Sequence, residues 1–91
     1  MTYRLLFSDS YNKRAKKFLK RHPQIRSQYQ KTLELLTLNP LHPSLRLHKL
    51  SGRLEGLSSV SINMRYRITL YFEITEEGIV LVDIGDHDQV Y

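Results

Sequence analysis

The sequence predicts one α+β domain over residues 1–91, with strands and helices in the order β-α-α-β-β-β. Two periodicities support this prediction. In the first half of the chain apolar residues recur at helical spacing, whereas in the second half they alternate with polar residues, which is typical of half-buried strands. The length suffices for one modest hydrophobic core and is too short for two. We therefore expect a helical hairpin packed on a twisted, mostly antiparallel sheet.

One strand and two helices are expected in the N-terminal half. Thr2–Phe7 is apolar enough for a strand that is covered on both faces, and the Ser-Asp-Ser sequence after it offers helix N-caps. A proline at position 23 ends the first helix and suits the first turn of the second helix, which Asn39-Pro40 ends. The apolar stripes of the two helices comprise Tyr11, Ala15, Phe18 and Leu19, and then Ile25, Tyr29, Leu33 and Leu36.

Three strands are expected in the C-terminal half, at residues 59–63, 66–72 and 79–84. The first two form a hairpin with one apolar face, which must pack on the helices, and one polar and basic face, which is left on the far side. The side chains expected on that far face are Ser59, Ser61, Arg67 and Tyr71. In the last strand we expect Ile84 to share a face with Val80 and Val82, and Gly85 to end the strand.

The net charge of +5 is divided unevenly along the chain. Residues 1–50 carry eleven Lys and Arg against two acidic residues, a balance of +9, whereas residues 51–91 carry three Arg against seven acidic residues, a balance of −4. A basic half of this kind is expected of a protein that binds nucleic acid, because neutralising phosphates releases counterions. Two solvated helix faces explain the same charges, so the charge alone leaves both readings open.

Composition excludes several kinds of site. The absence of cysteine rules out disulfides, thiolate metal ligands and a cysteine nucleophile. No apolar run approaches the ~20 residues that a membrane span needs, and the N-terminus lacks the pattern of a signal peptide, so we expect a cytoplasmic protein. The four histidines lack the spacing of a metal site, and no glycine-rich phosphate loop is present. No metal or cofactor is expected.

Three segments carry a resemblance to a known family: LHKLSGRLEGL, YRITLYF and IGDHDQVY. Their arrangement resembles the RelE/ParE superfamily of bacterial toxins from toxin–antitoxin pairs, over essentially the whole chain. A histidine in LHKL, together with a histidine and a closing aromatic residue in HDQVY, is most similar to the RelE/StbE and YafQ-like mRNA interferases. The resemblance implies a ribosome-dependent endoribonuclease that cuts mRNA in the ribosomal A site without a metal and is held inactive by a cognate antitoxin protein.

The same resemblance implies roles for four residues of this chain. Arg67 matches the strand arginine that stabilises the phosphate in the transition state. His87 matches a C-terminal histidine proposed as acid or base, and His48 matches the interferase histidine before the L-x-G turn. Tyr91 matches the terminal aromatic residue that stacks on the substrate or orients it.

Three positions depart from the pattern of those relatives. Ser59 and Ser61 stand where RelE has strand lysines, Ser61 also replaces a second YafQ-type histidine, and Asp83 replaces an arginine. The site is therefore expected to be less cationic than in the relatives. Part of the lost charge would have to come from Arg65 or Lys49.

The chemistry of metal-free RNA cleavage fits these residue types. A 2′-hydroxyl must lose its proton and attack the adjacent phosphate, extra negative charge must be stabilised, and the leaving 5′-oxygen must gain a proton. Histidine titrates near neutrality, and arginine holds two phosphate oxygens in a planar fork. A carboxylate near His87, from Asp83, Asp86 or Asp88, would raise the pKa of that histidine and favour a general acid.

Each candidate also has an ordinary structural explanation. Without the resemblance, His87 reads as a solvated turn histidine and Arg67 as a surface arginine, and the resemblance favours the functional reading of both. His48 reads equally as an exposed strand residue, and Tyr91 has the alternative of a frayed chain end. The other two histidines, at positions 22 and 42, flank prolines and are assigned to structure.

Two further functions stay open at this stage. A ParE-like toxin that inhibits DNA gyrase by binding, without nuclease activity, would share the fold and would fit the thinned cationic face. An inactive relative retained for antitoxin binding is the third possibility.

Overall fold

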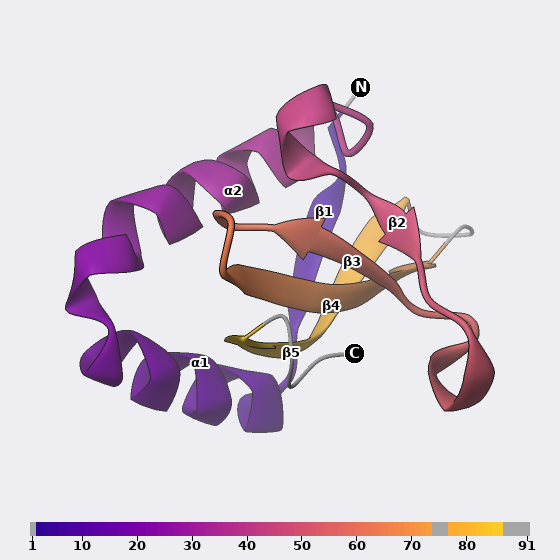
Figure 1. Ribbon diagram of the computed structural model, residues 1–91. Coiled ribbons are helices and arrows are strands. Elements are labelled where there is room, and N and C mark those ends of the chain that lie inside the picture. Colours follow the sequence, from indigo (N-terminus) through magenta and orange to yellow (C-terminus); the bar gives the residue numbers. More distant parts are fainter. Residues whose placement is uncertain (1, 74–76, 87–91) are drawn as a thin grey trace.

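The computed structural model describes residues 2–73 and 77–86 (Figure 1). Two helices and a five-stranded sheet make up this part of the chain, which confirms the predicted α+β fold. The strands and helices are β1 (Arg4–Phe7), α1 (Asp9–Arg21), α2 (Arg26–Leu38), β2 (His48–Lys49), β3 (Ser58–Ser61), β4 (Tyr66–Glu73) and β5 (Gly78–Asp86). Short 3-10 turns lie at Pro23–Ile25, Pro43–Leu45 and Gly52–Leu54.

The sheet has the strand order β1-β5-β4-β3-β2. Strand β1 pairs in parallel with β5, and all other neighbours are antiparallel. The expectation that β1 is covered on both faces is wrong: Arg4 and Phe7 are exposed, and Leu5 and Leu6 are only half-buried. At the opposite edge, the two-residue β2 makes β3 an internal strand.

The two helices start where the sequence predicts. Ser8 caps α1, because its hydroxyl oxygen accepts a hydrogen bond from the Tyr11 amide at 3.0 Å. Pro23 opens the turn that leads into α2. From that turn the helices diverge, so that α1 runs beside β5 while the end of α2 reaches β1, where the Tyr3 amide bonds the Thr37 carbonyl at 2.8 Å (Figure 1).

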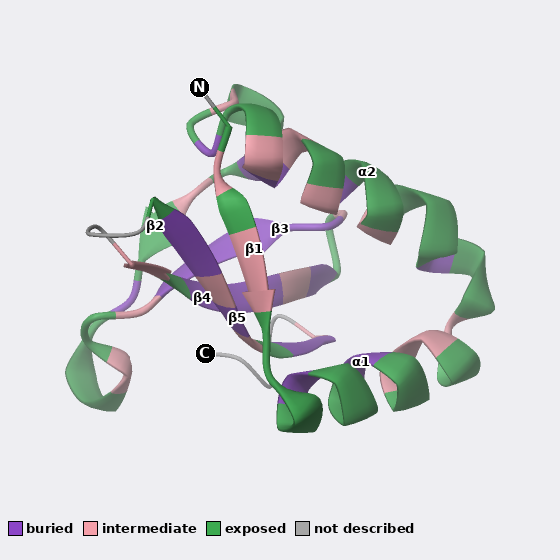
Figure 2. Ribbon diagram, turned by 180° about the vertical axis from the view of Figure 1, so that it is seen from behind, coloured by how far each residue is buried: buried purple, intermediate pink, exposed green. Residues whose placement is uncertain are grey.

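One hydrophobic core joins the helices to the sheet. Both predicted helix stripes face it: Tyr11, Ala15, Ile25 and Leu36 are buried, and the other four stripe residues are half-buried (Figure 2). The buried members of the core are Tyr11, Ala15, Ile25, Leu36, Leu45, Val60, Ile62, Tyr66, Ile68, Leu70, Ile79, Leu81 and Ile84. The layered arrangement leaves the second face of the sheet available for polar residues.

Two expectations about β5 are wrong. The strand does not end at Gly85 but continues to Asp86. A bulge also interrupts its pairing with β4: Thr69 pairs with Asp83 and Leu70 with Leu81, so Val82 is an extra residue. The bulge reverses the alternation beyond it, which is why Ile84 is buried in the same core as Leu81 instead of sharing a face with Val82.

The serines of β3 are not displayed as predicted. Ser59 is fully buried and Ser61 is 9 % exposed. On the same face Arg67 is half-buried, whereas Tyr71 is 37 % exposed as expected. The serines of β3 are shorter than the side chains beside them on the neighbouring strands. Their larger neighbours therefore cover them, and they form the bottom of this face of the sheet.

A tyrosine pair connects the two helices. The Tyr11 and Tyr29 hydroxyls share a hydrogen bond of 2.8 Å, and Tyr11 is fully buried. Burial raises the pKa of Tyr11 far above its usual value, and the neighbouring Tyr29 raises it further. Burial also raises the pKa of Tyr29, against a smaller lowering by the hydrogen bond from Tyr11. Both phenols therefore stay neutral in the folded protein at any pH near neutrality.

The tyrosine pair predicts a loss of stability in base. Because both folded-state pKa values are raised, the contribution of the pair is complete below the unfolded pKa of about 10 and is lost as pH rises above it. We expect Tyr11→Phe to lower the free energy of unfolding by about 1 kcal/mol at neutral pH. It should also flatten the fall in melting temperature above pH of about 10, as measured by circular dichroism. A control, Tyr71→Phe, should keep the wild-type slope; equal slopes in all three proteins would contradict the assignment.

The burial of Ser59 predicts an asymmetry between two serines. Replacing fully buried Ser59 with leucine adds methylenes to a packed position and should cost about 1–3 kcal/mol of unfolding free energy. The matched change Ser51→Leu lies at an exposed position and should alter stability by less than about 0.5 kcal/mol. Urea denaturation of both variants measures the difference, and equal midpoints would show that Ser59 is accessible.

Candidate functional site

The register of the sheet places two predicted site residues on one face. His48 of β2 pairs with Ser59 of β3, which pairs with Thr69 of β4. Arg67 lies two residues before Thr69 on β4, so it points to the same face. This face is opposite the core, because the alternate residues of β4 are the ones buried beneath the helices. His48 and Arg67 therefore stand on one surface, two strand spacings apart, about 10 Å across the strands.

Small residues flank Arg67 on both neighbouring strands. Its partner on β3 is Ser61, and its partner on β5 is Gly85. Directly paired residues are the nearest side chains on a sheet face, so Arg67 has a hydroxymethyl group on one side and no side chain on the other. The Ser61 hydroxyl also donates to the Asn63 carbonyl at 2.6 Å, which directs it to the β3–β4 turn. We call Arg67, Ser61 and Gly85 the arginine row.

A second row of residues lies beside the arginine row. Ser59 and Thr69 are both buried, and together they form a low polar floor between β2 and β5. His48 stands exposed at one end of this floor and lines a cleft of ≈250 Å³ together with Lys49, Leu50, Ser51 and Leu54. Lys49 is one of the two cations proposed to compensate for the missing lysines, and it therefore lies beside His48.

The acidic residues near the end of β5 are engaged by arginines. Arg14 of α1 forms an ion pair with Asp83 at 3.3 Å and donates to the Val82 carbonyl at 2.6 Å. Arg65 forms an ion pair with Asp86 at 3.0 Å. Asp83, which replaces an arginine of the relatives, is therefore partly neutralised by a helix residue far away in the sequence.

Two of the four predicted site residues, His87 and Tyr91, lie outside the described residues, as does Asp88. The last described residue of β5, Asp86, pairs with Tyr66, the residue next to Arg67. Sequence reasoning missed Gly85 as part of the site, since a glycine after a strand is usually read as its end. In the sequence, the only signal that would have placed Gly85 on the face of Arg67 is its position two residues after Asp83.

The remaining two histidines make contacts within the fold, as their assignment to structure predicts. The His22 ring packs on Phe18 and Tyr66, with its Nδ1 at 3.3 Å from the Tyr66 hydroxyl. His42 Nδ1 accepts a hydrogen bond from the Ser44 amide at 3.2 Å and caps a 3-10 turn. Both rings are thereby given structural roles.

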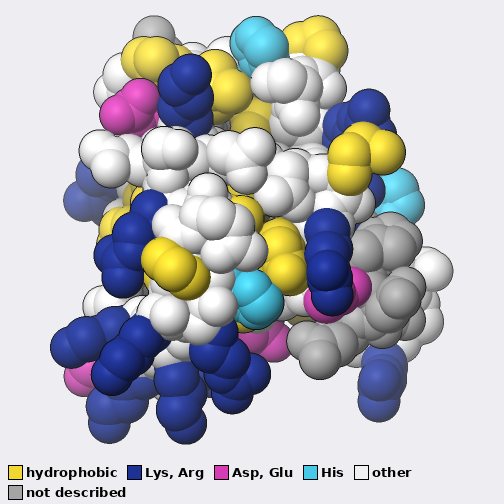
Figure 3. All heavy atoms as spheres, turned by 60° about the vertical axis from the view of Figure 1, so that its left-hand side comes forward, with side chains coloured by type: hydrophobic (Ala, Val, Ile, Leu, Met, Phe, Trp, Pro, Cys, Tyr) yellow, Lys and Arg dark blue, Asp and Glu magenta, His cyan; other side chains and the backbone are white. Residues whose placement is uncertain are grey.

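A basic groove lies along α1. Lysine and arginine side chains gather over this helix in Figure 3, and they border a groove of ≈450 Å³. The residues that line it are Lys13, Arg14, Lys16, Lys17 and Lys20. A row of cations along one helix suits the phosphate backbone of a nucleic acid or an acidic protein segment.

Between residues 2 and 86, leaving out 74–76, no helix is long and apolar enough to cross a membrane. Within the same described part, no three His, Cys, Asp or Glu side chains gather as they would around a metal ion.

Comparisons with known proteins were made by sequence and by structure. No protein-family model matches the chain, and no curated protein sequence matches it. Solved structures do match over nearly the full length. YafQ from E. coli strain BL21(DE3) has a TM-score of 0.77 at 18% sequence identity, with 98% of each chain covered.

Two similar structures are complexes of toxins with antitoxins. In the E. coli DinJ-YafQ toxin-antitoxin complex the match has a TM-score of 0.76 at 19% identity and covers 100% of this chain and 99% of the other. In the heterotetrameric YoeB-YefM toxin-antitoxin complex from Staphylococcus aureus it has a TM-score of 0.71 at 19% identity and covers 96% and 99%. The chain therefore has the fold of the YafQ and YoeB toxins, which is the fold of the RelE/ParE superfamily.

Proposed function

We propose that this chain is the toxin of a type II toxin–antitoxin system and that it acts as a ribosome-dependent endoribonuclease, cleaving mRNA without a metal. The observation that carries the proposal is the arginine row: a strand arginine flanked by Ser61 and Gly85, on the same face as an exposed histidine. The likeness in fold to YafQ and YoeB supports it.

The arginine row suits a phosphate because the residues paired with Arg67 on the two neighbouring strands, Ser61 and Gly85, have a small side chain or none. Two N–H groups of a planar guanidinium hold two phosphate oxygens at once, and the positive charge stabilises the extra charge of the pentacoordinate transition state. A bulky side chain opposite Arg67 would occupy that space. The two residues paired with Arg67, Ser61 and Gly85, are both small.

The proposed reaction is an in-line transphosphorylation. The 2′-oxygen of one nucleotide loses its proton and bonds to the adjacent phosphorus, the bond from phosphorus to the 5′-oxygen breaks, and a 2′,3′-cyclic phosphate and a 5′-hydroxyl are formed. His87 supplies the proton to the leaving 5′-oxygen, and His48 or ribosomal RNA accepts the 2′-proton. Tyr91 orients the substrate base by stacking.

The groove along α1 supports a ribosomal partner. The site itself is poor in cations, because Ser59 and Ser61 occupy lysine positions and Arg65 is paired with Asp86. Affinity for RNA must then come from elsewhere on the surface. The four lysines of the α1 groove are placed to contribute it, whereas Arg14 is paired with Asp83. This division assigns binding to α1 and chemistry to the sheet face.

A cognate antitoxin is the second proposed partner. Both similar complexes pair a toxin with an antitoxin. An antitoxin for this chain should be acidic where it crosses Arg67 and the α1 groove, and apolar where it meets Leu38 and Leu41, which are 65% and 76% exposed.

The proposal predicts loss of cleavage in two variants. Arg67→Ala removes the charge that stabilises the transition state and should reduce cleavage at least about 100-fold. His87→Ala removes the general acid and should have an effect of similar size. Primer-extension mapping of a translated mRNA after brief induction measures both, and His48→Ala in parallel tests whether His48 or ribosomal RNA is the base.

A control arginine lies at the other edge of the sheet. Arg4→Ala on β1 should cut like the wild type, and thermal unfolding should show Arg67→Ala folded. Unchanged cleavage in Arg67→Ala and His87→Ala would refute the proposed mechanism. Growth arrest without cuts, combined with inhibited supercoiling by DNA gyrase, would instead identify a ParE-like binding toxin.

A further inference from the structure

A second pocket lies at the β3–β4 turn, around the edge of the sheet from Arg67. It has a volume of ≈380 Å³, the size range of small-ligand sites. Its walls come from the start of α2 and from the turn, and its polar or aromatic lining residues are Gln24, Gln28, Asn63, Arg65 and Tyr66. Three amides, a guanidinium and an aromatic ring are the groups that proteins use to hydrogen-bond and stack unpaired RNA bases.

We propose that this turn pocket binds a base of single-stranded RNA beside the cleaved position and prefers guanine or uracil, which present a carbonyl oxygen where adenine and cytosine present an amino group. The inference rests on the proposed function, because it gives that nuclease a base preference. The hydrogen bonds that the pocket residues make within the protein determine which of their donors and acceptors can face a ligand.

The Asn63 amide is fixed by the turn. Its Oδ1 accepts hydrogen bonds from the Arg65 and Tyr66 backbone amides, each at 2.9 Å. Because both partners are N–H donors, the Asn63 atom that they contact must be the amide oxygen. The Asn63 Nδ2 group must therefore point away from the backbone of the turn. The Nδ2 group donates to the Gln28 Oε1 at 3.0 Å.

The fixed asparagine in turn orients Gln28. With its Oε1 accepting from Asn63, the Gln28 side chain offers its Nε2 group as a donor. Donors from Gln28 and from the Arg65 guanidinium then border one pocket. A pocket rich in donors complements ligand acceptors, and guanine O6 and uracil O4 accept hydrogen bonds at the positions where adenine and cytosine carry amino donors.

Arg65 supplies a stacking surface. Its guanidinium lies 5.4 Å from the centre of the Tyr66 ring, and its Nε is held by Asp86 at 3.0 Å. The Arg65 side chain is nevertheless 72% exposed, so a base can lie against its plane. Asp86 pairs with Tyr66, which precedes Arg67 on β4, so the turn pocket lies around the end of the β3–β4 hairpin from the proposed phosphate position.

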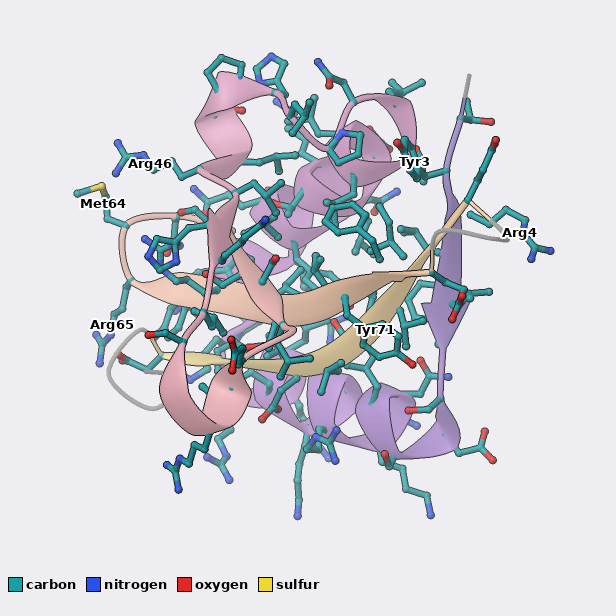
Figure 4. All side chains as sticks on the ribbon, turned by 90° about the vertical axis from the view of Figure 1, so that its right-hand side faces the viewer. Tyr3, Arg4, Arg46, Met64, Arg65 and Tyr71 are labelled. Carbon is teal, nitrogen blue, oxygen red and sulfur yellow. The ribbon has the colours of Figure 1, made fainter. Side chains whose placement is uncertain are left out.

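The rim of the turn pocket carries two arginines and a methionine. Arg46, Met64 and Arg65 extend outward from one edge of the molecule, opposite the edge that carries Tyr3 and Arg4 (Figure 4). Met64 is 82% exposed and its sulfur lies 4.0 Å from the Arg46 Nη1. An apolar side chain between two cations can pack on a base while the cations meet its flanking phosphates.

A charge change at Gln28 tests the inference. Gln28→Glu keeps an oxygen for the Asn63 Nδ2 group but removes the donor and adds a negative charge. Gln30→Glu, two residues further along α2 and also exposed, makes the same charge change outside the pocket. We expect mapped cuts of the wild type and of Gln30→Glu to be enriched in guanine or uracil at one position beside the cut.

Gln28→Glu should lose this enrichment and cut the favoured sites about tenfold more slowly. If the wild type cuts mRNA and Gln28→Glu keeps the same rate and the same enrichment as Gln30→Glu, the turn pocket does not read a base, although the proposed nuclease stands.

A binding measurement separates the pocket from the nuclease. In ¹⁵N-labelled protein, the Asn63 and Gln28 side-chain amide signals should shift on titration with 5′-GMP or 5′-UMP, and less with 5′-AMP. Such shifts in a protein that makes no cuts would support the pocket and refute the proposed function. No shift with any nucleotide, or a shift only with an acidic peptide, would overturn the base pocket.

Discussion

The alternation along β4 is the constraint on which the core and the candidate site both depend. Ile68 and Leu70 are fully buried beneath the helices, so the residues between and before them, Thr69 and Arg67, must face the other way. A shift of one residue in the register would bury Arg67 and expose the centre of the core. Pairing with β3 on one side and β5 on the other holds that register in place.

Small residues define the site as much as charged ones do. Ser61 and Gly85 place no large side chain at the positions paired with Arg67, while Ser59 and Thr69 are short side chains between Arg67 and His48. Charge is kept at the periphery, in the α1 groove and at the rim of the turn pocket. On this account the surface holds RNA through its edges and acts on it at a nearly neutral centre.

The sequence was sufficient for features set by local chemistry. The Ser8 cap, the helix that follows it and the alternation of β4 are all read from neighbouring residues, and all are confirmed. Features set by distant partners were out of reach. The burial of Ser59 depends on its pairing with β2, and the face on which Ile84 lies depends on the bulge at Val82. The parallel pairing of β1 with β5 depends on the path of the whole chain. The roles of His87 and Tyr91 remain predictions.

The central claim is that a substrate phosphate lies over Arg67 between Ser61 and Gly85. A cryo-electron microscopy structure of this chain on a ribosome with an mRNA whose 2′-hydroxyls are methylated tests it most directly, because blocking the nucleophile traps the uncut substrate. The account predicts a phosphate at the Arg67 guanidinium with the flanking bases toward His48 and the β3–β4 turn. An mRNA that passes the sheet face without approaching Arg67 would contradict it.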